Sequence, residues 1–463
     1  MTMMKTTRYI LPVAAALSLT LSSCHIYKAY EMPTDNAYVK TFEQSLTAAP
    51  DSASLPYLEW EKVFTDPVLQ GYIRTALANN KDLDNAVLNI DIARAQLKGA
   101  KLSYFPAVAL NPNGGAAKYG DGKMDTWTYT IPMSISWEID VFGKILNRKR
   151  GAKVAVEQME DYRQAVRSQI ICGVASCYYG LMMLNQQLDL TERTSVIWKD
   201  QVESMKLMKE AGMVNEAAVV QSSANYWSIM GSIPDIKHSI HELQNTMSLL
   251  LHAYPQEYAV SSDMDFNLPA DIEAGVPVTY LAARPDVRAA ERGLAAAYYT
   301  TNSARAAFYP GLTISSNGGF TNLLGSIVSN PGKWFIQLAG SLAAPLFSRG
   351  QNIANLEVAK ARQTQAMNDF ETKVLSASAD VSDALAAYRF NHEKRECLLR
   401  QIDDLEKSVE YTQELLTLDP HTTYLEVLTA RSSLLNAQMS SLAAWHDKVS
   451  ALISLYQSVG GGR

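Results

Sequence analysis

Two stretches of the sequence alternate between apolar and polar residues with the period of two that a β-strand produces. In the first, TWTYTIPMSISWEID, one face carries the apolar residues Trp127, Tyr129, Ile131, Met133, Ile135 and Trp137. The opposite face is polar. Apolar positions bounded by aromatic rings are what a transmembrane strand needs, because the apolar side chains face lipid and the rings lie at its interfaces. A half-buried soluble hairpin alternates in the same way, so the pattern alone leaves both readings open.

The second stretch, WFIQLAGSLAAP, places Trp334, Ile336 and Leu338 on one face, although its other face is less polar. We expect residues 107–117 and 312–320 to form partner strands. Four strands cannot close a membrane barrel, whose smallest members have about eight. Open strand edges are excluded from lipid because each unpaired N–H or C=O group there would cost several kcal/mol of free energy. The strands therefore either stay outside the membrane or close by oligomerisation, and three copies would supply twelve.

Very long helices are the plainest prediction. Residues 351–419 contain neither Pro nor Gly, and residues 145–210 contain no Pro. A helix over the first of these ranges would be roughly 100 Å long. Apolar residues at Phe370, Val374 and Ala377 begin a seven-residue period, which indicates supercoiled helix packing. A plain coiled-coil rod explains this stretch equally well.

The chain also repeats itself. A helical run from Asp82 to the sequence Tyr-Phe-Pro at 104–106 is matched by one from Asp286 to Tyr309-Pro310, displaced by 204 residues. Each copy reads as helix, two short strands, long helix and second helix. The predicted fold class is therefore mainly α with a small β part, built as a tandem repeat. We divide the chain into a signal peptide (1–23), an N-terminal arm (24–65), a first repeat (66–254), a linker (255–277), a second repeat (278–459) and a tail (460–463).

The N-terminus has the features of an export signal. Lys5 and Arg8 precede an apolar run over residues 10–21, which is too short to span a bilayer. The following Leu-Ser-Ser-Cys resembles a bacterial lipobox, which predicts lipidation of Cys24. His25 at the next position favours the outer membrane. Removing the signal shifts the formal net charge from −6 to −8, which argues against nucleic-acid binding. The remaining chain has no apolar helix long enough to span a membrane, so any crossing would require strands.

No catalytic, cofactor or metal site is expected. The sequence has no Gly-rich phosphate loop and no nucleophile elbow, and the segment beginning His241-Glu242 lacks the second His of a zinc-protease helix. Cys172 and Cys177 are five apart in a helical stretch, which fits buried small residues better than metal ligands. We therefore expect a protein that is not an enzyme.

Several motifs in order resemble one family. Seven segments of this chain are similar to segments of TolC-like outer-membrane efflux proteins, in their lipoprotein (NodT-type) branch. They are LEWEKVFTDPVLQGYIRTALANNKDL, ARPDVRAAE, SYFP, AFYP, IDVFGK, APLFSRGQ and YLEVLTARSSLLNAQ. The resemblance implies a homotrimer: a twelve-stranded outer-membrane β-barrel continuous with a periplasmic α-helical barrel. It also implies a passive channel that docks to a periplasmic adaptor and to an inner-membrane pump of the resistance-nodulation-division type, with outer-membrane lipid around the strands.

The same resemblance implies a periplasmic gate formed by the inner helix pair. Glu426 matches an acidic gate position, whereas Thr429 replaces the next acidic residue and Thr422 replaces a gating Arg. In the first repeat Ala218 stands where an Asp is expected, with Glu216 close by. Three copies of Glu426 around an axis would form an anionic ring, although a solvated helix face is the plainer alternative.

The two hairpin tips are implied as adaptor contacts. Gly212 fits the family's tip glycine in the first repeat, but Pro420 takes its place in the second. A proline cannot adopt positive φ and supplies no N–H, so the second tip must be built differently.

Two other functions remain open at this point. One is a structural coiled-coil lipoprotein that conducts nothing, against which the alternating strands argue. The other is the same outer-membrane duct serving type I protein secretion, which the sequence does not separate from small-molecule efflux.

Overall fold

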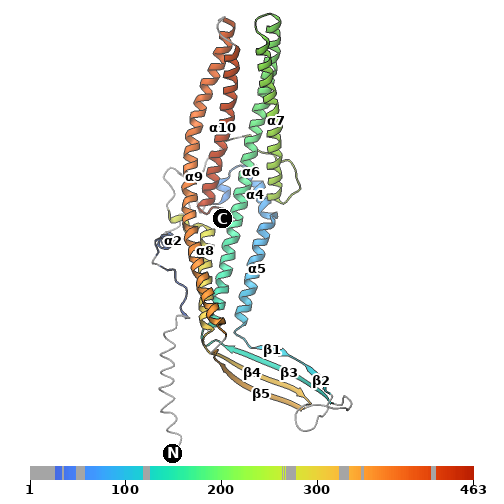
Figure 1. The fold of residues 1–463 in the computed structure, drawn as a ribbon, viewed down its shortest axis with the longest axis vertical. Helices are drawn as coiled ribbons and strands as arrows, with labels where there is room; N and C mark the ends of the chain where they lie inside the picture. Colours follow the sequence, from blue (N-terminus) through green and yellow to red (C-terminus); the bar gives the residue numbers. More distant parts are fainter. Residues whose placement is uncertain are drawn as a thin grey trace, which may run out of the picture. The chain divides into compact units, whose positions relative to one another are not determined.

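The computed structural model describes residues 27–33, 36–47, 58–117, 126–262, 264, 266, 278–322, 333–345, 349–418 and 424–462. These residues form a mainly helical chain with one small sheet, which confirms the predicted fold class (Figure 1). Within this part of the chain, none of the helices combines the length and the apolar character needed to cross a membrane. The chain divides into two compact units, one holding the sheet and the other an aromatic core.

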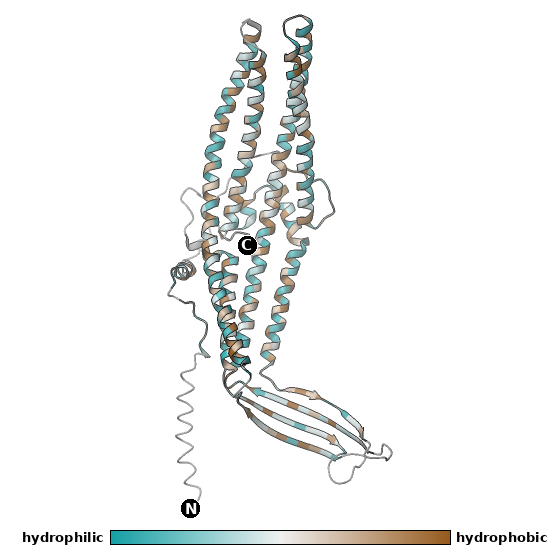
Figure 2. Ribbon diagram, in the orientation of Figure 1, coloured by the Kyte–Doolittle hydropathy of each residue, from teal (hydrophilic) through white to brown (hydrophobic). Residues whose placement is uncertain are grey.

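The first unit contains an antiparallel sheet of strands β1 (Ala107–Leu110), β2 (Asn113–Ala117), β3 (Thr126–Ile139), β4 (Gly311–Thr321) and β5 (Lys333–Ala343). Both β1 and β2 pair with β3, which pairs with β4, which pairs with β5. The sheet is thus four strands wide, and β3–β4 joins the strands of the two repeats. Figure 2 shows apolar and polar segments alternating along these strands.

The expected strand over residues 107–117 is interrupted. Asn111 and Pro112 separate β1 from β2, and both pieces follow β3 in register. Pro112 has no N–H to donate to the ladder, while the neighbouring Asn111 N–H still reaches the Pro132 carbonyl at 3.1 Å. Opposite Pro132 stands Gly319, where a side chain would collide with the Ile131 carbonyl. The pairing of β3 with β4 therefore requires glycine at this position.

The helices repeat in the same order in both halves of the chain. The helices α5 (Lys81–Leu102) and α8 (Pro285–Ala306) are each 22 residues long. The long helices are α6 (Lys144–Glu210) and α9 (Gln351–Leu418), of 67 and 68 residues. They lead into α7 (Glu216–Leu251) and α10 (Tyr424–Ser458). The absence of Pro and the sparse Gly in the long helices explains why they run unbroken.

Shorter elements precede the first repeat of these helices. They are α2 (Ala37–Thr47), α3 (Trp60–Val63) and α4 (Pro67–Asn79), and a 3₁₀ turn (Val278–Ala283) stands before α8. The start of α4 follows helix-capping rules. Asp66 accepts hydrogen bonds from the Val68 and Leu69 N–H groups, and Pro67 occupies the first helical position, where its missing N–H costs nothing.

The second unit is held by an aromatic core. The rings of Phe64 and Phe266 stack at a centroid distance of 5.9 Å, and Tyr456 meets Phe64 edge to face at 5.8 Å. Cys172 and Cys177 are buried in this core, which confirms their prediction as buried residues. Burial raises the pKa of the Cys172 thiol to about 12 and that of Cys177 to about 11.

The glycines after α10 pack against this core. The Gly462 carbonyl accepts hydrogen bonds from Gln164 at 2.9 Å and from Arg167 at 3.1 Å, and its N–H donates to the Tyr456 hydroxyl at 2.8 Å. Gly460 and Gly462 have φ of 89° and 92°, a region that side chains disfavour. The described residues 460–462 of the predicted C-terminal tail are therefore a packed part of the second unit.

Candidate functional site

The residues expected to face lipid share one face of the sheet. Residues paired directly across an antiparallel ladder lie on the same face. Ile131 pairs with Phe320, and Phe320 with Trp334, which makes one apolar row across three strands. Met133, Gly318 and Ile336 form the next row, Ile135, Ser316 and Leu338 the one after it, and Trp137 lies opposite Ile314.

This apolar face is exposed in a single chain. Trp334, Ile336 and Leu338 are 70–76 % exposed, and Ile131, Met133 and Trp137 are also exposed, whereas Tyr129 and Ile135 are half-buried. Trp127 pairs with Ala116 in the ladder, but its side chain lies outside the described residues. Soluble monomers seldom expose so many large apolar side chains side by side, so this face requires an apolar partner.

The Trp137 ring is fixed at the end of the sheet nearest the helices. Its indole N–H donates to the Tyr104 carbonyl at 2.9 Å. Phe142 and Tyr309, which follow β3 and precede β4, stack at 4.9 Å. A polar ring atom bonded at one end and an apolar body exposed at the other suit a position at a membrane interface.

The first hairpin tip is closed by Gly212. Its φ of +73° lies in the left-handed region, and the Gly212 N–H donates to the Lys209 carbonyl at 2.9 Å. The Met213 N–H donates to the Met208 carbonyl at 2.9 Å, which completes a helix-ending motif that favours glycine. On the other side of the tip, Asn215 caps α7 by accepting from the Ala218 N–H at 3.1 Å. The sequence therefore specifies both halves of the turn.

The two predicted gate residues of the first repeat, Glu216 and Ala218, lie in different surroundings at this tip. The Glu216 carboxylate pairs with Lys209 across the turn and is exposed, whereas Ala218 packs against a buried cluster. Sequence reasoning missed Lys209 because the partner of Glu216 lies on the other helix. The only local signal for it was a cation in the last turn of α6, where the helix dipole favours positive charge.

That buried cluster joins the two hairpins near their tips. It consists of Trp198 and Met205 from α6, Val219 and Ile229 from α7, and Tyr424 and Leu428 from α10. The structure therefore brings Ala218 and the first turn of α10, which carries Glu426, to the same cluster. Glu426 and Thr429 lie on the exposed side of that turn, and the Thr429 hydroxyl donates to the Leu425 carbonyl at 2.8 Å. Thr422 and Pro420 lie outside the described residues.

Two residues near this gate region were not predicted. Tyr424 is buried, and its hydroxyl has no hydrogen-bond partner among the described residues. Burial raises the pKa of Tyr424 to about 12, although nearby Arg431 opposes the rise. Arg431 of α10 donates to the Gln413 side chain of α9 at 2.9 Å, which ties the two helices of the second hairpin together.

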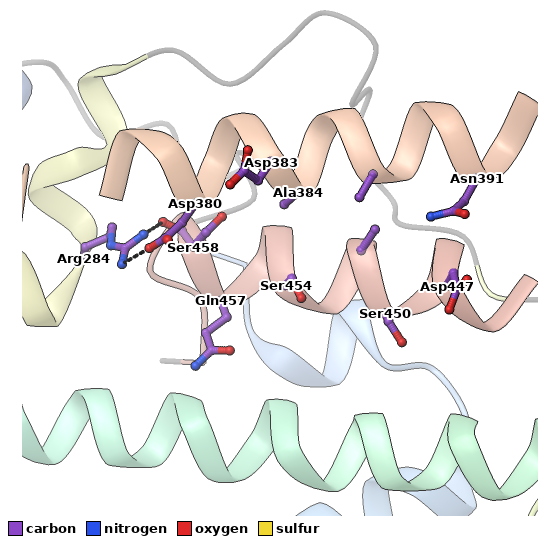
Figure 3. Close-up of a pocket in the computed structure, with 12 residues that line it drawn as sticks. Arg284, Asp380, Asp383, Ala384, Asn391, Asp447, Ser450, Ser454, Gln457 and Ser458 are labelled. Carbon is purple, nitrogen blue, oxygen red and sulfur yellow. Dashed lines mark hydrogen bonds and ion pairs between the residues drawn. The ribbon is translucent and has the colours of Figure 1, made fainter. Parts of the chain in front are cut away.

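A polar hollow of about 650 Å³ lies farther along the same hairpin, between α9 and α10 (Figure 3). Asp380 and Asp383 approach it from α9, and Asp447 and Ser454 from α10. At one end Arg284 donates to Asp380 at 2.9 Å and to Asp286 at 2.8 Å. The three aspartates of the lining give the hollow a negative potential that is only partly balanced by this one guanidinium.

Arg284 also fixes the end of α10. Its side chain is 8 % exposed and donates to the Ser458 carbonyl at 3.0 Å. Burial disfavours the charge of Asp286, but hydrogen bonding and the charges of Arg284 and Lys373 outweigh burial and lower the pKa of Asp286. The local signal for this network is weak: it is the Arg-Pro-Asp order at the start of α8.

Comparison with known proteins identifies the family that this chain resembles. The family model described as outer membrane efflux protein matches residues 72–251 and 276–461. "Cation efflux system protein CusC" of Escherichia coli is 28 % identical over 98 % of both chains. "Probable outer membrane lipoprotein SilC" of Salmonella typhimurium is 29 % identical over 87 % of this chain and 88 % of its own. A crystal structure of CusC, titled for transmembrane channel formation, superposes with a TM-score of 0.82 at 24 % identity, covering 94 % of this chain and 98 % of that one.

Proposed function

This chain belongs to the outer membrane efflux protein family, and we propose that three copies of it form the outer-membrane channel of a tripartite efflux system. In this proposal the channel is passive. Substrates reach it from an inner-membrane pump of the resistance-nodulation-division type through a periplasmic adaptor. No cofactor takes part.

One observation carries the proposal: the sheet is open on both sides and apolar on one face. Its edge strands are β1 with β2 on one side and β5 on the other. Edges of this kind are unstable in lipid unless another strand pairs with them. Pairing β5 of one copy with β1 and β2 of the next closes three sheets into twelve strands. That closure also turns the exposed apolar face of the sheet, including Trp334, Ile336 and Leu338 of β5, towards lipid.

The N-terminal arm supports membrane attachment through Cys24, which itself lies outside the described residues. Three residues later, Tyr27 contacts the turn between β3 and α6, where its hydroxyl donates to the Val141 carbonyl, and α6 itself, where its own carbonyl accepts from Arg150 at 2.9 Å. Three residues of chain span at most about 11 Å. A lipid attached at Cys24 would therefore be tethered close to the end of β3, where the membrane interface is expected.

The gate proposal rests on the first turn of α10. Glu426 is exposed there, and the buried residues of the same turn pack against the other hairpin. Around a three-fold axis, three Glu426 carboxylates would form an anionic ring that attracts cations. Thr429, Thr422 and Ala218 supply no charge, so Glu426 is the main acidic gate residue in this proposal and Glu216 is held by Lys209.

The adaptor contact is proposed at the hairpin tips. Gly212 and its neighbour Met213, which is 71 % exposed, present a small, uncharged surface at the end of the first hairpin. Substituting Gly212 with Arg would place a long cation on that surface. We expect this variant to trimerise but to lose efflux, measured as drug or metal sensitivity of a complemented deletion strain. Normal efflux by the variant would contradict the adaptor role.

The experiment that tests the channel combines mass and conductance. The purified protein should migrate as a trimer when unboiled, and planar bilayers should show small, cation-selective single-channel currents. Glu426→Gln should reduce the cation selectivity, with Glu410→Gln, an exposed carboxylate elsewhere on the second hairpin, as the matched control. A monomeric rod without conductance would instead support the structural lipoprotein. If a strain lacking this protein failed to export a secreted protein but kept its normal sensitivity to small molecules, the result would support type I secretion.

A further inference from the structure

The first turns of α6 carry an unusual concentration of positive charge. Five cations occur within residues 144–153, namely Lys144, Arg148, Lys149, Arg150 and Lys153, and we call them the basic collar. No acidic residue lies in the first turn of this helix. The first ten residues of α9, at the equivalent place in the second repeat, contain one cation, Lys360, and one acid, Glu357.

This concentration is electrostatically unfavourable within the chain. Cations on neighbouring turns of a helix repel one another, and Lys144 in the first turn is also disfavoured by the partial positive charge of the helix N-terminus. Among the described residues, Lys144 pairs with Glu138 at 2.9 Å and Lys153 approaches Glu157 at 3.6 Å, at the two ends of the collar. The Asp140 carboxylate caps the helix by accepting from the Leu146 N–H at 2.7 Å.

The three central cations have no carboxylate partner among the described residues. Lys149 lies 5.5 Å from the ring centre of Tyr104, and Arg150 donates to the Tyr27 carbonyl. Arg148 is exposed and has no ion pair in this part of the structure. The centre of the collar thus keeps its positive charge, which suits an anionic partner outside the chain.

Part of the collar lines a hollow of about 580 Å³. Lys144 and Arg148 contribute charge to it, the hydroxyls of Ser103, Thr300 and Ser303 contribute hydrogen-bonding groups, and Glu138 is present as the partner of Lys144. Small apolar side chains, Ala152, Ala155 and Ala296, line the same space. Cations and hydroxyls beside an apolar wall match a phosphate group carried on an apolar chain.

The position of the collar identifies the class of partner. Lys144 is five residues beyond the end of β3, which carries the exposed Trp137, and Phe105, next to Tyr104 in the chain, is also exposed. Aromatic side chains followed by clustered Lys and Arg are typical of the surface of a membrane that contains anionic lipid.

We propose that the basic collar binds the phosphate headgroup of an anionic phospholipid in the leaflet that adjoins the helical end of the sheet. This proposal rests on the membrane position of the strands in the proposed function. The apolar wall of the hollow receives the start of an acyl chain, and Arg148, which lines the hollow, holds the phosphate. The next residue, Lys149, adds positive charge outside the hollow. The lipid thereby neutralises the centre of the collar and fixes the depth of the sheet in the membrane.

The test uses the full-length protein in nanodiscs of phosphatidylcholine with increasing phosphatidylglycerol, and native mass spectrometry counts the lipids retained. Each cation near an anionic surface contributes about 1 kcal/mol, which is roughly fivefold in affinity. Arg148→Gln combined with Lys149→Gln should therefore weaken phosphatidylglycerol retention roughly 25-fold. The control is Lys199→Gln with Lys206→Gln, which removes the same charge farther along the same helix. This control should retain phosphatidylglycerol like the wild type.

Equal retention of phosphatidylglycerol and phosphatidylcholine by the wild type would overturn the proposal, as would unchanged retention in the collar variant. Loss of the trimer by the collar variant, without a change in lipid retention, would assign this face to contact between copies instead. Wild-type trimer mass and conductance in phosphatidylcholine alone test the channel separately. Failure of the lipid site is therefore distinguishable from failure of the proposed function.

Discussion

Asn80 and Arg284 occupy equivalent positions in the two repeats, each immediately before a 22-residue helix and 204 residues apart. Both side chains reach a carbonyl at the end of the last helix of their own repeat. Asn80 donates to the Leu250 carbonyl at 3.0 Å, and Arg284 donates to the Ser458 carbonyl at 3.0 Å. The repeats thus preserve the same connection between the start of one helix and the end of another while changing the side chain that makes it.

The change adds charge in the second repeat. The Asn80 side-chain oxygen caps its own helix by accepting from the Asp82 N–H at 2.9 Å, and the Asp82 side chain is exposed. Arg284 instead binds the Asp286 and Asp380 carboxylates, and Asp380 belongs to α9. The neutral Asn80 side chain thus connects the start of α5 with the end of α7. The charged Arg284 side chain connects α8, α9 and α10. Sensitivity to charge and pH should therefore be concentrated in the second repeat.

Replacing Arg284 with Ala should have the largest effect. The substitution removes the guanidinium from the Ser458 carbonyl, Asp380 and Asp286, although Asp286 keeps its contact with Lys373. Breaking a buried ion pair costs about 3–5 kcal/mol. We expect about 3 kcal/mol, at the low end, because the Asp380 side chain is 47 % exposed and remains hydrated. Denaturant unfolding of the trimer in detergent measures this loss. A loss of unfolding free energy smaller than that caused by Asn80→Ala would contradict the stronger role assigned to Arg284.

Asn80→Ala should cost less, about 2 kcal/mol. It removes a helix cap, typically worth about 1 kcal/mol, and leaves the Leu250 carbonyl without its partner. The same unfolding measurement applies. Asn80→Asp is the matched variant: it keeps the cap but loses the donor, so a stability equal to that of the Ala variant would show that the cap contributes nothing.

Asp286→Asn should cost about 1.5 kcal/mol, because the hydrogen bonds lost are to charged groups. The pKa of Asp286 is lowered in the folded protein, so its ionised form contributes stability above the unfolded pKa of about 4. That contribution is lost as the pH falls through the lower, folded value. The stability difference between wild type and variant should therefore be constant near neutral pH and shrink below about pH 4. A difference that grows with acid would show that Asp286 is not stabilised as an anion.

Gly212→Ala should have the smallest effect, about 1 kcal/mol. An added methyl group at Gly212 meets no atom within 4 Å, so the cost comes from its positive φ alone. Gly212→Asn should cost less than Ala because Asn tolerates this conformation better. Thermal unfolding of both variants tests the order, and equal losses would point to a cause other than backbone conformation.

Much of this architecture was predictable because its signals are local. The long helices follow from the absence of Pro and the seven-residue period, and the predicted start of the second at Gln351 is confirmed. The predicted alternation in the segment that became β3 is likewise confirmed as a strand. The gate at the first turn of α10 and the adaptor contact at Gly212 stay predictions, although Gly212 does close the first hairpin tip with positive φ.

By itself, then, the sequence determined the element types, their repetition and the apolar face of the strands, because each depends on residues a few positions apart. Only the tertiary structure decided that β3 pairs with β4, that Glu216 is held by Lys209, and that Arg284 joins Asp380 to the end of α10. The physical reason is separation: Arg284 and Ser458 lie 174 residues apart, and no periodicity records which distant groups will meet. Such pairings are chosen by burial and charge once the helices have packed.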